Sequence, residues 1–170
     1  MTTGTTARSG AHWLVFLATA GLVVILDQLT KAWLVANVSP GDVVTVVGEY
    51  LRLVLHQNSG ALFGLFRDNA LLFGIVSLGV VGLIAGYHAR SGRSLYLSIA
   101  LGLLLGGAIG NLIDRLRLGY VVDFVDIGIG DLRFFTFNVA DAAISTAIVL
   151  IVGAALFPSL QRLGERPSDG

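Results

Sequence analysis

The sequence predicts an integral membrane protein that is mainly α-helical, with four transmembrane helices, a small extracytoplasmic antiparallel β-sheet and a short interfacial helix. Hydrophobic residues make up 55% of the 170 residues and charged residues only 13%, whereas soluble domains carry about a quarter charged residues. The apolar residues are gathered in four long runs, and a spanning helix needs roughly 20 mostly apolar residues. We expect one membrane-embedded domain over residues 1–170.

The composition excludes several kinds of site. The formal net charge is zero, so no basic surface indicates a nucleic-acid partner. The chain has no cysteine, which excludes thiol catalysis, disulfides and cysteine-based metal sites. The three histidines, at positions 12, 56 and 88, lack the spacing of a zinc-binding helix. We therefore expect neither a metal nor another cofactor.

Four apolar runs define the predicted spans, because in lipid a chain has to satisfy its own backbone hydrogen bonds. The spans are residues 13–36, 69–88, 95–113 and 139–157. An even number of spans puts both termini on one side of the membrane. The basic residues divide evenly between the two sides, but the terminal side is shorter and hence more densely basic, so the positive-inside rule favours cytoplasmic termini.

Two outward segments, residues 37–68 and 114–138, are expected to fold. β-Branched and aromatic residues partly alternate in "DVVTVVGEYLRLVLHQN", which predicts strand. The stretch "GYVVDFVDIGIGDLRFFTFN" predicts two more strands around a glycine-rich turn. Residues 60–66, "GALFGLF", are apolar but too short to span, so they are expected to lie in the interface.

Charged residues in or beside a span are costly and indicate function. Asp27 and Lys31 in "LDQLTKAW" lie one helical turn apart. They form either an ion pair near the outer interface, kept hydrated by snorkelling, or a pair that orients a neighbouring site. In "GNLIDR", Asn111, Asp114 and Arg115 come at the outer end of the third span, where Arg115 paired with Asp114 is the simplest interpretation.

Two further carboxylates are predicted at the same membrane face. Asp123 in "VVDF" projects from an apolar strand. Asp141 in "FNVAD" follows Asn138 by three residues, which is typical of a capping box at a helix start. Two carboxylates held close together share a proton, so one activates water while the other polarises a carbonyl. This is aspartic-protease chemistry and requires no metal.

Five motifs together resemble those of the lipoprotein signal peptidase (signal peptidase II) family: "LDQLTK", "NSGALFG", "GNLIDR", "VVDFVD" and "FNVAD". The resemblance extends over residues 13–157. It implies a bacterial inner-membrane aspartic peptidase that cleaves prolipoproteins before a diacylglyceryl-modified cysteine at the extracytoplasmic face. It also implies inhibition by globomycin. Leu62 departs from the pattern, since a smaller residue is expected there.

The resemblance assigns roles to residues. It implies that Asp123 and Asp141 are the catalytic pair. The residues expected to bind substrate or support the site are Asn58, Gly60, Asn111, Asp114, Arg115, Asn138, Asp27 and Lys31. A groove floored by the glycine-rich third span suits a signal-peptide helix, and Asn111 and Asn138 are expected to bind the substrate backbone.

Three alternatives remain open from the residues alone. A proton-coupled transporter would relay protons through Asp27, Lys31 and Asp141. A Ser–Lys peptidase would use Lys31 as base with Ser59 or Ser145 as nucleophile. In a catalytically inert assembly subunit, the acids would only cap helices.

Overall fold

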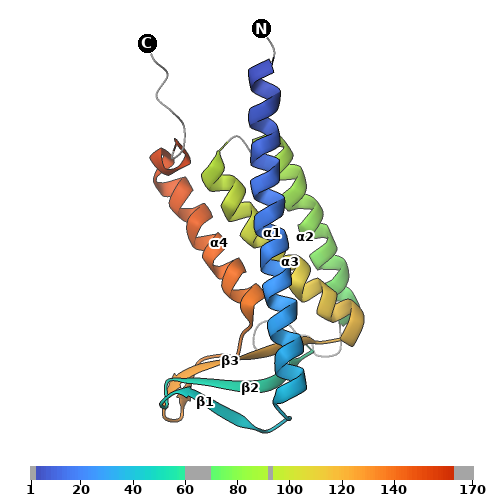
Figure 1. Ribbon diagram of the computed structural model, residues 1–170, viewed down its shortest axis with the longest axis vertical. Helices are drawn as coiled ribbons and strands as arrows, with labels where there is room; N and C mark the ends of the chain where they lie inside the picture. The colour runs from blue at the N-terminus through green and yellow to red at the C-terminus, as the bar shows by residue number, and fades with distance from the viewer. Residues whose placement is uncertain (1–2, 60–69, 92–93, 163–170) are drawn as a thin grey trace.

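Four helices run side by side in the computed structural model, and a small sheet lies across one end of the bundle, opposite both termini (Figure 1). The structure describes residues 3–59, 70–91 and 94–162. The helices are α1 (Thr3–Asn37), α2 (Ala70–Ser91), α3 (Leu95–Leu118) and α4 (Val139–Leu156), followed by a 3₁₀ turn, η2 (Pro158–Arg162). The strands are β1 (Val43–Val47), β2 (Leu51–Asn58), β3 (Val121–Ile129) and β4 (Leu132–Arg133). The predicted mainly helical fold with a small antiparallel sheet is confirmed.

The helices have the length and surface of membrane spans. Segments 10–37, 95–118 and 139–156 are long and apolar enough to cross a bilayer. In α2, residues 75–90 form a shorter apolar helix among those whose side chains are described. Large apolar side chains point outward from the bundle, such as Leu14 and Val149, both 70% exposed. Such a surface requires lipid around it, so the chain is an integral membrane protein.

Two helices are longer than their apolar runs. α1 begins at Thr3, ten residues before the predicted span. α3 continues past residue 113 to Leu118, where Gly119 ends it with a left-handed φ of 78° and a 3.2 Å hydrogen bond from its N–H to Arg115 O. The apolar run of α3 ends at residue 113 but the helix continues for five more residues, so Asp114 and Arg115 lie on the helix. The predicted interfacial helix at residues 60–66 lies outside the described residues.

Glycines on α3 bring its neighbours into close contact. A Cβ on Gly106 would lie 2.7 Å from both Ala20 O and Val23 Cβ of α1. A Cβ on Gly107 would lie 2.5 Å from Ala140 O of α4. Small residues permit such packing in membranes. These glycines are therefore covered by α1 and α4, and other residues of α3 face the predicted substrate groove.

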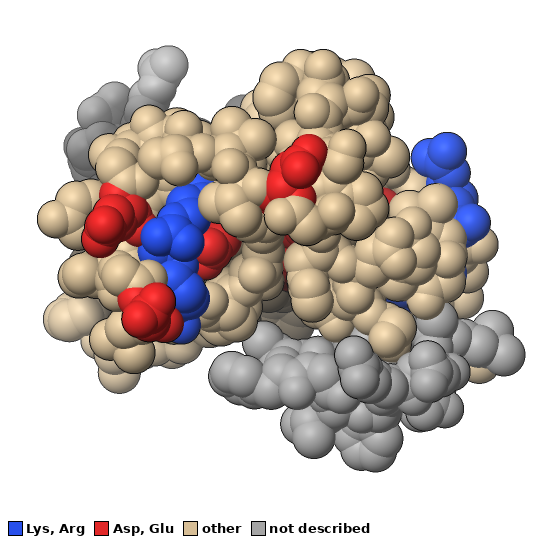
Figure 2. All heavy atoms as spheres, turned by 90° about the horizontal axis from the view of Figure 1, so that it is seen from below, with Lys and Arg blue, Asp and Glu red and all other residues tan. Residues whose placement is uncertain are grey.

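The sheet is antiparallel in the order β1-β2-β3-β4. The first half of β3 is buried, and Phe124 packs with Leu34 and Val38 at the end of α1. Asp123 pairs with His56 across β2 and β3. Alternation along β3 turns Asp123 away from the face that carries Phe124. Viewed from the sheet end, acidic and basic side chains meet in one cluster on a surface that is otherwise mostly uncharged (Figure 2).

Candidate active site

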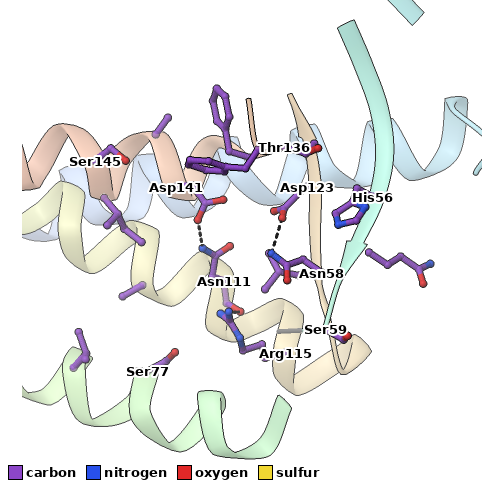
Figure 3. A pocket seen from close by; sticks show the side chains of 18 of the residues that line it. His56, Asn58, Ser59, Ser77, Asn111, Arg115, Asp123, Thr136, Asp141 and Ser145 are labelled. Carbon is purple, nitrogen blue, oxygen red and sulfur yellow. Dashed lines mark hydrogen bonds between the residues drawn. The ribbon is translucent and has the colours of Figure 1, made fainter. Parts of the chain in front are cut away.

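A cavity of about 1020 Å³ lies between α2, α3, α4 and the sheet. Its membrane part is apolar, with Val76, Val80, Ile144 and Ile148 in its walls. Its other end carries the polar side chains predicted from the sequence, and Asp123 and Asp141 face the same space there (Figure 3). The cavity thus joins an apolar groove to a pair of carboxylates.

The start of α4 fixes the direction of Asp141. The backbone N–H of Asp141 donates to Asn138 Oδ1 at 2.9 Å, and the N–H of Asn138 donates to Asp141 Oδ2 at 3.2 Å. This is the predicted capping box, which is confirmed. The remaining oxygen, Asp141 Oδ1, accepts a 2.8 Å hydrogen bond from Asn111 Nδ2. Asp141 therefore uses one carboxylate oxygen in the capping box and directs the other toward Asn111 in the site.

Asp123 is only 1% exposed and receives two amide hydrogen bonds. Asn58 Nδ2 donates to Oδ2 at 2.9 Å, and Asn138 Nδ2 donates to Oδ1 at 2.7 Å. Burial raises the pKa of the Asp123 carboxyl from its ordinary 3.8 to about 6, and the charge of Asp141 adds to this rise. The two hydrogen bonds oppose it. Asp123 is thus a carboxyl that holds its proton into the mildly acidic range.

Asn111 and Asn138 connect the two carboxylates. Asn138 Nδ2 donates to Asn111 Oδ1 at 3.1 Å, and the two amides donate onward to Asp141 and Asp123. Asn138 is fully buried and Asn111 is 7% exposed. In the structure the polar atoms of these amides are engaged by the carboxylates and by each other, and their binding of the substrate backbone stays a prediction.

A buried ion-pair network around Lys31 contacts the Asn111–Asn138 pair that connects the two carboxylates. Lys31 Nζ lies 2.8 Å from both Asp27 Oδ2 and Asp114 Oδ2 and donates to Asn111 Oδ1 at 3.2 Å. Asp27 Oδ1 accepts the N–H of Ala140 at 3.0 Å, which attaches α1 to the start of α4. Lys31 is 4% exposed, so the interpretation of a hydrated, snorkelling pair is wrong. The alternative, a pair that orients a neighbouring site, fits the contacts.

Arg115 has surroundings different from those expected. Asp114 forms its ion pair with Lys31 rather than with its neighbour. The Arg115 side chain lines the cavity, and its Nη1 donates to Asn111 O at 3.3 Å. Its guanidinium therefore adds positive charge beside the two carboxylates. Gly60, the remaining predicted site residue, lies outside the described residues.

Sequence reasoning missed several site residues. Gln28 Nε2 donates to Asp114 Oδ1 at 3.0 Å and to Asp27 Oδ2 at 3.2 Å. It follows Asp27 within the first motif, but nothing in its pattern indicates which residues it contacts. The cavity is also lined by residues from β2 and from the segment before α4: His56, Gln57, Phe134, Phe135, Thr136 and Phe137. The aromatic run "RFFTF" in an outward segment was the available signal.

The comparisons with known proteins agree with this site. A family model described as Signal peptidase (SPase) II matches residues 19–157. The chain belongs to the signal peptidase II family. It is therefore a protease that works in lipoprotein processing.

Individual relatives support the same assignment. The chain is 38% identical over 138 residues to a lipoprotein signal peptidase of Staphylococcus carnosus (strain TM300), covering 81% of this chain and 87% of that one. It is 39% identical over 145 residues to one of Moorella thermoacetica (strain ATCC 39073 / JCM 9320), covering 85% and 94%. Similarity therefore extends over nearly the whole length of these relatives.

Two solved bacterial membrane enzymes, both determined by the in meso method, share the fold. One, at 2.3 Å resolution, superposes with a TM-score of 0.78 at 29% identity and covers 95% of this chain and 94% of that one. The other, at 1.9 Å, gives 0.76 at 32% identity and covers 87% and 94%. The similarity to these membrane enzymes thus includes both the bundle and the sheet.

Proposed function

We propose that Asp123 and Asp141 are the catalytic pair of an aspartic endopeptidase that removes the signal peptide from diacylglyceryl-modified prolipoproteins, just before the lipidated cysteine. The observation that carries the proposal is that the two carboxylates share one cavity and are joined by a continuous amide bridge. Close acids of this kind share a proton, so one is ionised while the other is neutral.

The proposed reaction is water attack on the peptide bond before the cysteine. The ionised carboxylate takes a proton from a water molecule, whose oxygen bonds to the carbonyl carbon. The protonated carboxyl donates its hydrogen to the carbonyl oxygen, which gives a neutral tetrahedral diol. The first carboxyl then gives its proton to the cysteine nitrogen, the second carboxylate takes a proton from one hydroxyl of the diol, and the C–N bond breaks. A new acid and an amine result, and the pair again shares one proton.

The cavity suits a lipidated substrate. Its apolar part between α2, α3 and α4 accommodates a signal-peptide helix, while acyl chains remain in membrane lipid. We place the site at the extracytoplasmic face of a bacterial inner membrane, with both termini cytoplasmic. We also expect a globomycin-type cyclic peptide to compete for this cavity.

The alternative chemistries fit the contacts less well. A Ser–Lys peptidase needs a free amine beside its serine, but Lys31 is held between two carboxylates at 2.8 Å. A proton-coupled transporter needs a relay through the membrane, whereas the buried acids that the structure describes gather at the sheet end of the bundle. The acids of an inert subunit would have no reason to share one cavity.

The deciding experiment measures cleavage of a purified diacylglyceryl-modified prolipoprotein. Asp123→Asn and Asp141→Asn should each fold and insert normally but lose cleavage. Ser59→Ala and Ser145→Ala are matched controls in the same cavity and should keep most activity. Normal cleavage by either Asp variant sinks the proposal, and complete loss in a Ser variant revives the serine mechanism. A chelator should leave the rate unchanged.

A further inference from the structure

The segment between β4 and α4 forms an aromatic wall, which we define as Phe134, Phe135 and Phe137. All three side chains line the cavity that holds the two carboxylates. The rings of Phe134 and Phe135 are 4.2 Å apart, and those of Phe135 and Phe137 are 6.3 Å apart. Phe134 is 61% exposed and Phe135 is 37% exposed. Two neighbouring rings with this much open surface present an apolar contact face to whatever enters the cavity.

The wall is held at both ends, although its middle is not a strand. Strand β4 ends at Arg133, and residues 134–136 have no regular structure. At the far end, Phe137 pairs with Val125 of β3 through hydrogen bonds of 2.8 and 3.1 Å. Phe137 directly precedes Asn138, which caps α4, so this attachment belongs to the candidate active site. The attachment at the other end of the wall, at Arg133, involves different residues.

Arg133 makes the near anchor. Its Nε lies 3.0 and 3.1 Å from the two Asp126 carboxylate oxygens, and its Nη2 lies 2.9 Å from Oδ2. Its Nη1 donates to Glu49 O at 2.6 Å, and its Nη2 donates to Asp126 O at 3.0 Å. The Arg133 guanidinium thus contacts both β3 and the β1–β2 turn, and Arg133 directly precedes the aromatic wall. Both Asp126 and Arg133 belong to the outward segment 114–138 predicted from the sequence, where no pattern indicated this contact.

Gly128 makes room for this contact. A Cβ at Gly128 would lie 2.8 Å from both Cα and Cδ of Arg133, so the arginine side chain crosses β3 over a residue without a side chain. The next hydrogen bond, from Phe134 N to Ile127 O at 2.8 Å, continues the same anchor. The ion pair is partly shielded, with the Arg133 side chain 19% and the Asp126 side chain 13% exposed. Such a multidentate arginine contact restricts geometry as well as adding energy.

We propose that Phe134 and Phe135 are a specificity-determining surface that binds an apolar group of the substrate beside the scissile bond, and that Arg133, through Asp126, is the positioning residue that holds this surface in place. The inference rests on the proposed function. It separates two tasks at the cavity: the Asn138 anchor positions the carboxylates, and the Arg133 anchor positions the wall. Loosening the second anchor weakens substrate binding and leaves the acids in place.

The test compares Arg133→Met and Asp126→Asn with Arg117→Met, which removes an exposed cation at the end of α3. With a diacylglyceryl-modified prolipoprotein and the full chain in detergent, KM should rise about tenfold in the two anchor variants while kcat stays within about twofold. The double variant should be no worse than either single one, because both remove one interaction. Arg117→Met should match the unmodified protein. Phe134→Ala should raise KM as well.

Hydrogen exchange gives a readout that does not depend on activity. The backbone amides of residues 134–136 should exchange faster in Arg133→Met, with no change at Asp141. An unchanged KM in both anchor variants, or a fall in kcat at constant KM, overturns the proposal. If Arg133→Met does not fold, Asp126→Asn and Phe134→Ala decide by the same criterion. The proposed function fails on a different result, namely cleavage by Asp123→Asn or Asp141→Asn.

Discussion

The side-chain amide of Asn138 donates a 3.1 Å hydrogen bond to Asn111 Oδ1, so two asparagines from α3 and the start of α4 act as one bridge between two carboxylates. Each amide nitrogen also donates to one of the acids, that of Asn111 to Asp141 and that of Asn138 to Asp123. Because the Asn111 oxygen is also held by Lys31 at 3.2 Å, its amide cannot turn over without losing both contacts. The relative position of Asp123 and Asp141 therefore depends on this pair.

Substitutions of Asn138 separate capping from bridging. Asn138→Ser keeps a side-chain oxygen to cap α4 but removes the amide donors, whereas Asn138→Ala removes both. We expect both variants to lose about 100-fold in cleavage, because small displacements of reacting groups cost this much. Asn138→Ala, which also loses the cap, should be about 1 kcal/mol less stable than Asn138→Ser. Cleavage assays and thermal unfolding in detergent measure the two effects, and a Ser variant with an unchanged cleavage rate would remove the bridge from the mechanism.

The Lys31 network predicts a large effect on stability. Lys31→Met leaves Asp27 and Asp114 buried without their cation, and removing one partner of a buried pair costs about 3–5 kcal/mol. Adding Asp114→Asn removes one uncompensated charge, so the double variant should regain part of the loss. Arg90→Met, at an exposed position in α2, is the control and should leave unfolding unchanged. Equal unfolding temperatures for the Lys31 variant and this control would contradict the role of the network.

The contact of α1 with α3 is tested at Gly106. In Gly106→Ala, the added carbon would meet Ala20 O and Val23 Cβ at 2.7 Å, so the helices have to separate. Such overpacking costs about 1–3 kcal/mol, and it also moves Lys31 away from Asn111, so cleavage should fall. Gly82→Ala in α2 is the matched control, since nothing lies within 4 Å of its added carbon. If both variants unfold alike, α1 does not depend on this close approach.

Local patterns account for the part of the structure that could be predicted. Hydropathy located the helices, and the spacing of Asn138 and Asp141 was enough to identify the capping box. Neither pattern indicates which side chains meet across the fold. The bridge joins residues 27 positions apart, and Gln28 reaches Asp114 across 86 positions. The burial of Lys31 was not predicted for the same reason. The spacing within α1 indicates its contact with Asp27, but nothing indicates the contact with Asp114 on α3, which provides the second negative charge that stabilises a buried lysine.

The raised pKa of Asp123 predicts how stability changes with pH. A group with a pKa of about 6 in the folded state and 3.8 when unfolded holds its proton more tightly when folded, so it contributes stability that is lost as pH rises through about 6. The difference corresponds to about 3 kcal/mol. Asp123→Asn stays neutral, so its stability relative to the unmodified protein should increase between pH 4 and pH 7 by roughly this amount. A constant difference in unfolding temperature across this range would contradict the shift.

The absence of cysteine allows a direct test of orientation. Single cysteines introduced as Asp131→Cys, in the turn after β3, and Arg90→Cys, near the end of α2, lie at opposite ends of the bundle and at exposed positions. The shorter, more densely basic terminal side should face the cytoplasm. A membrane-impermeant maleimide should then label Asp131→Cys in intact spheroplasts and Arg90→Cys only after permeabilisation. Both should react equally in detergent, which controls for reactivity. The reverse pattern would put the carboxylates on the cytoplasmic face, where prolipoproteins already translocated across the membrane could not reach them.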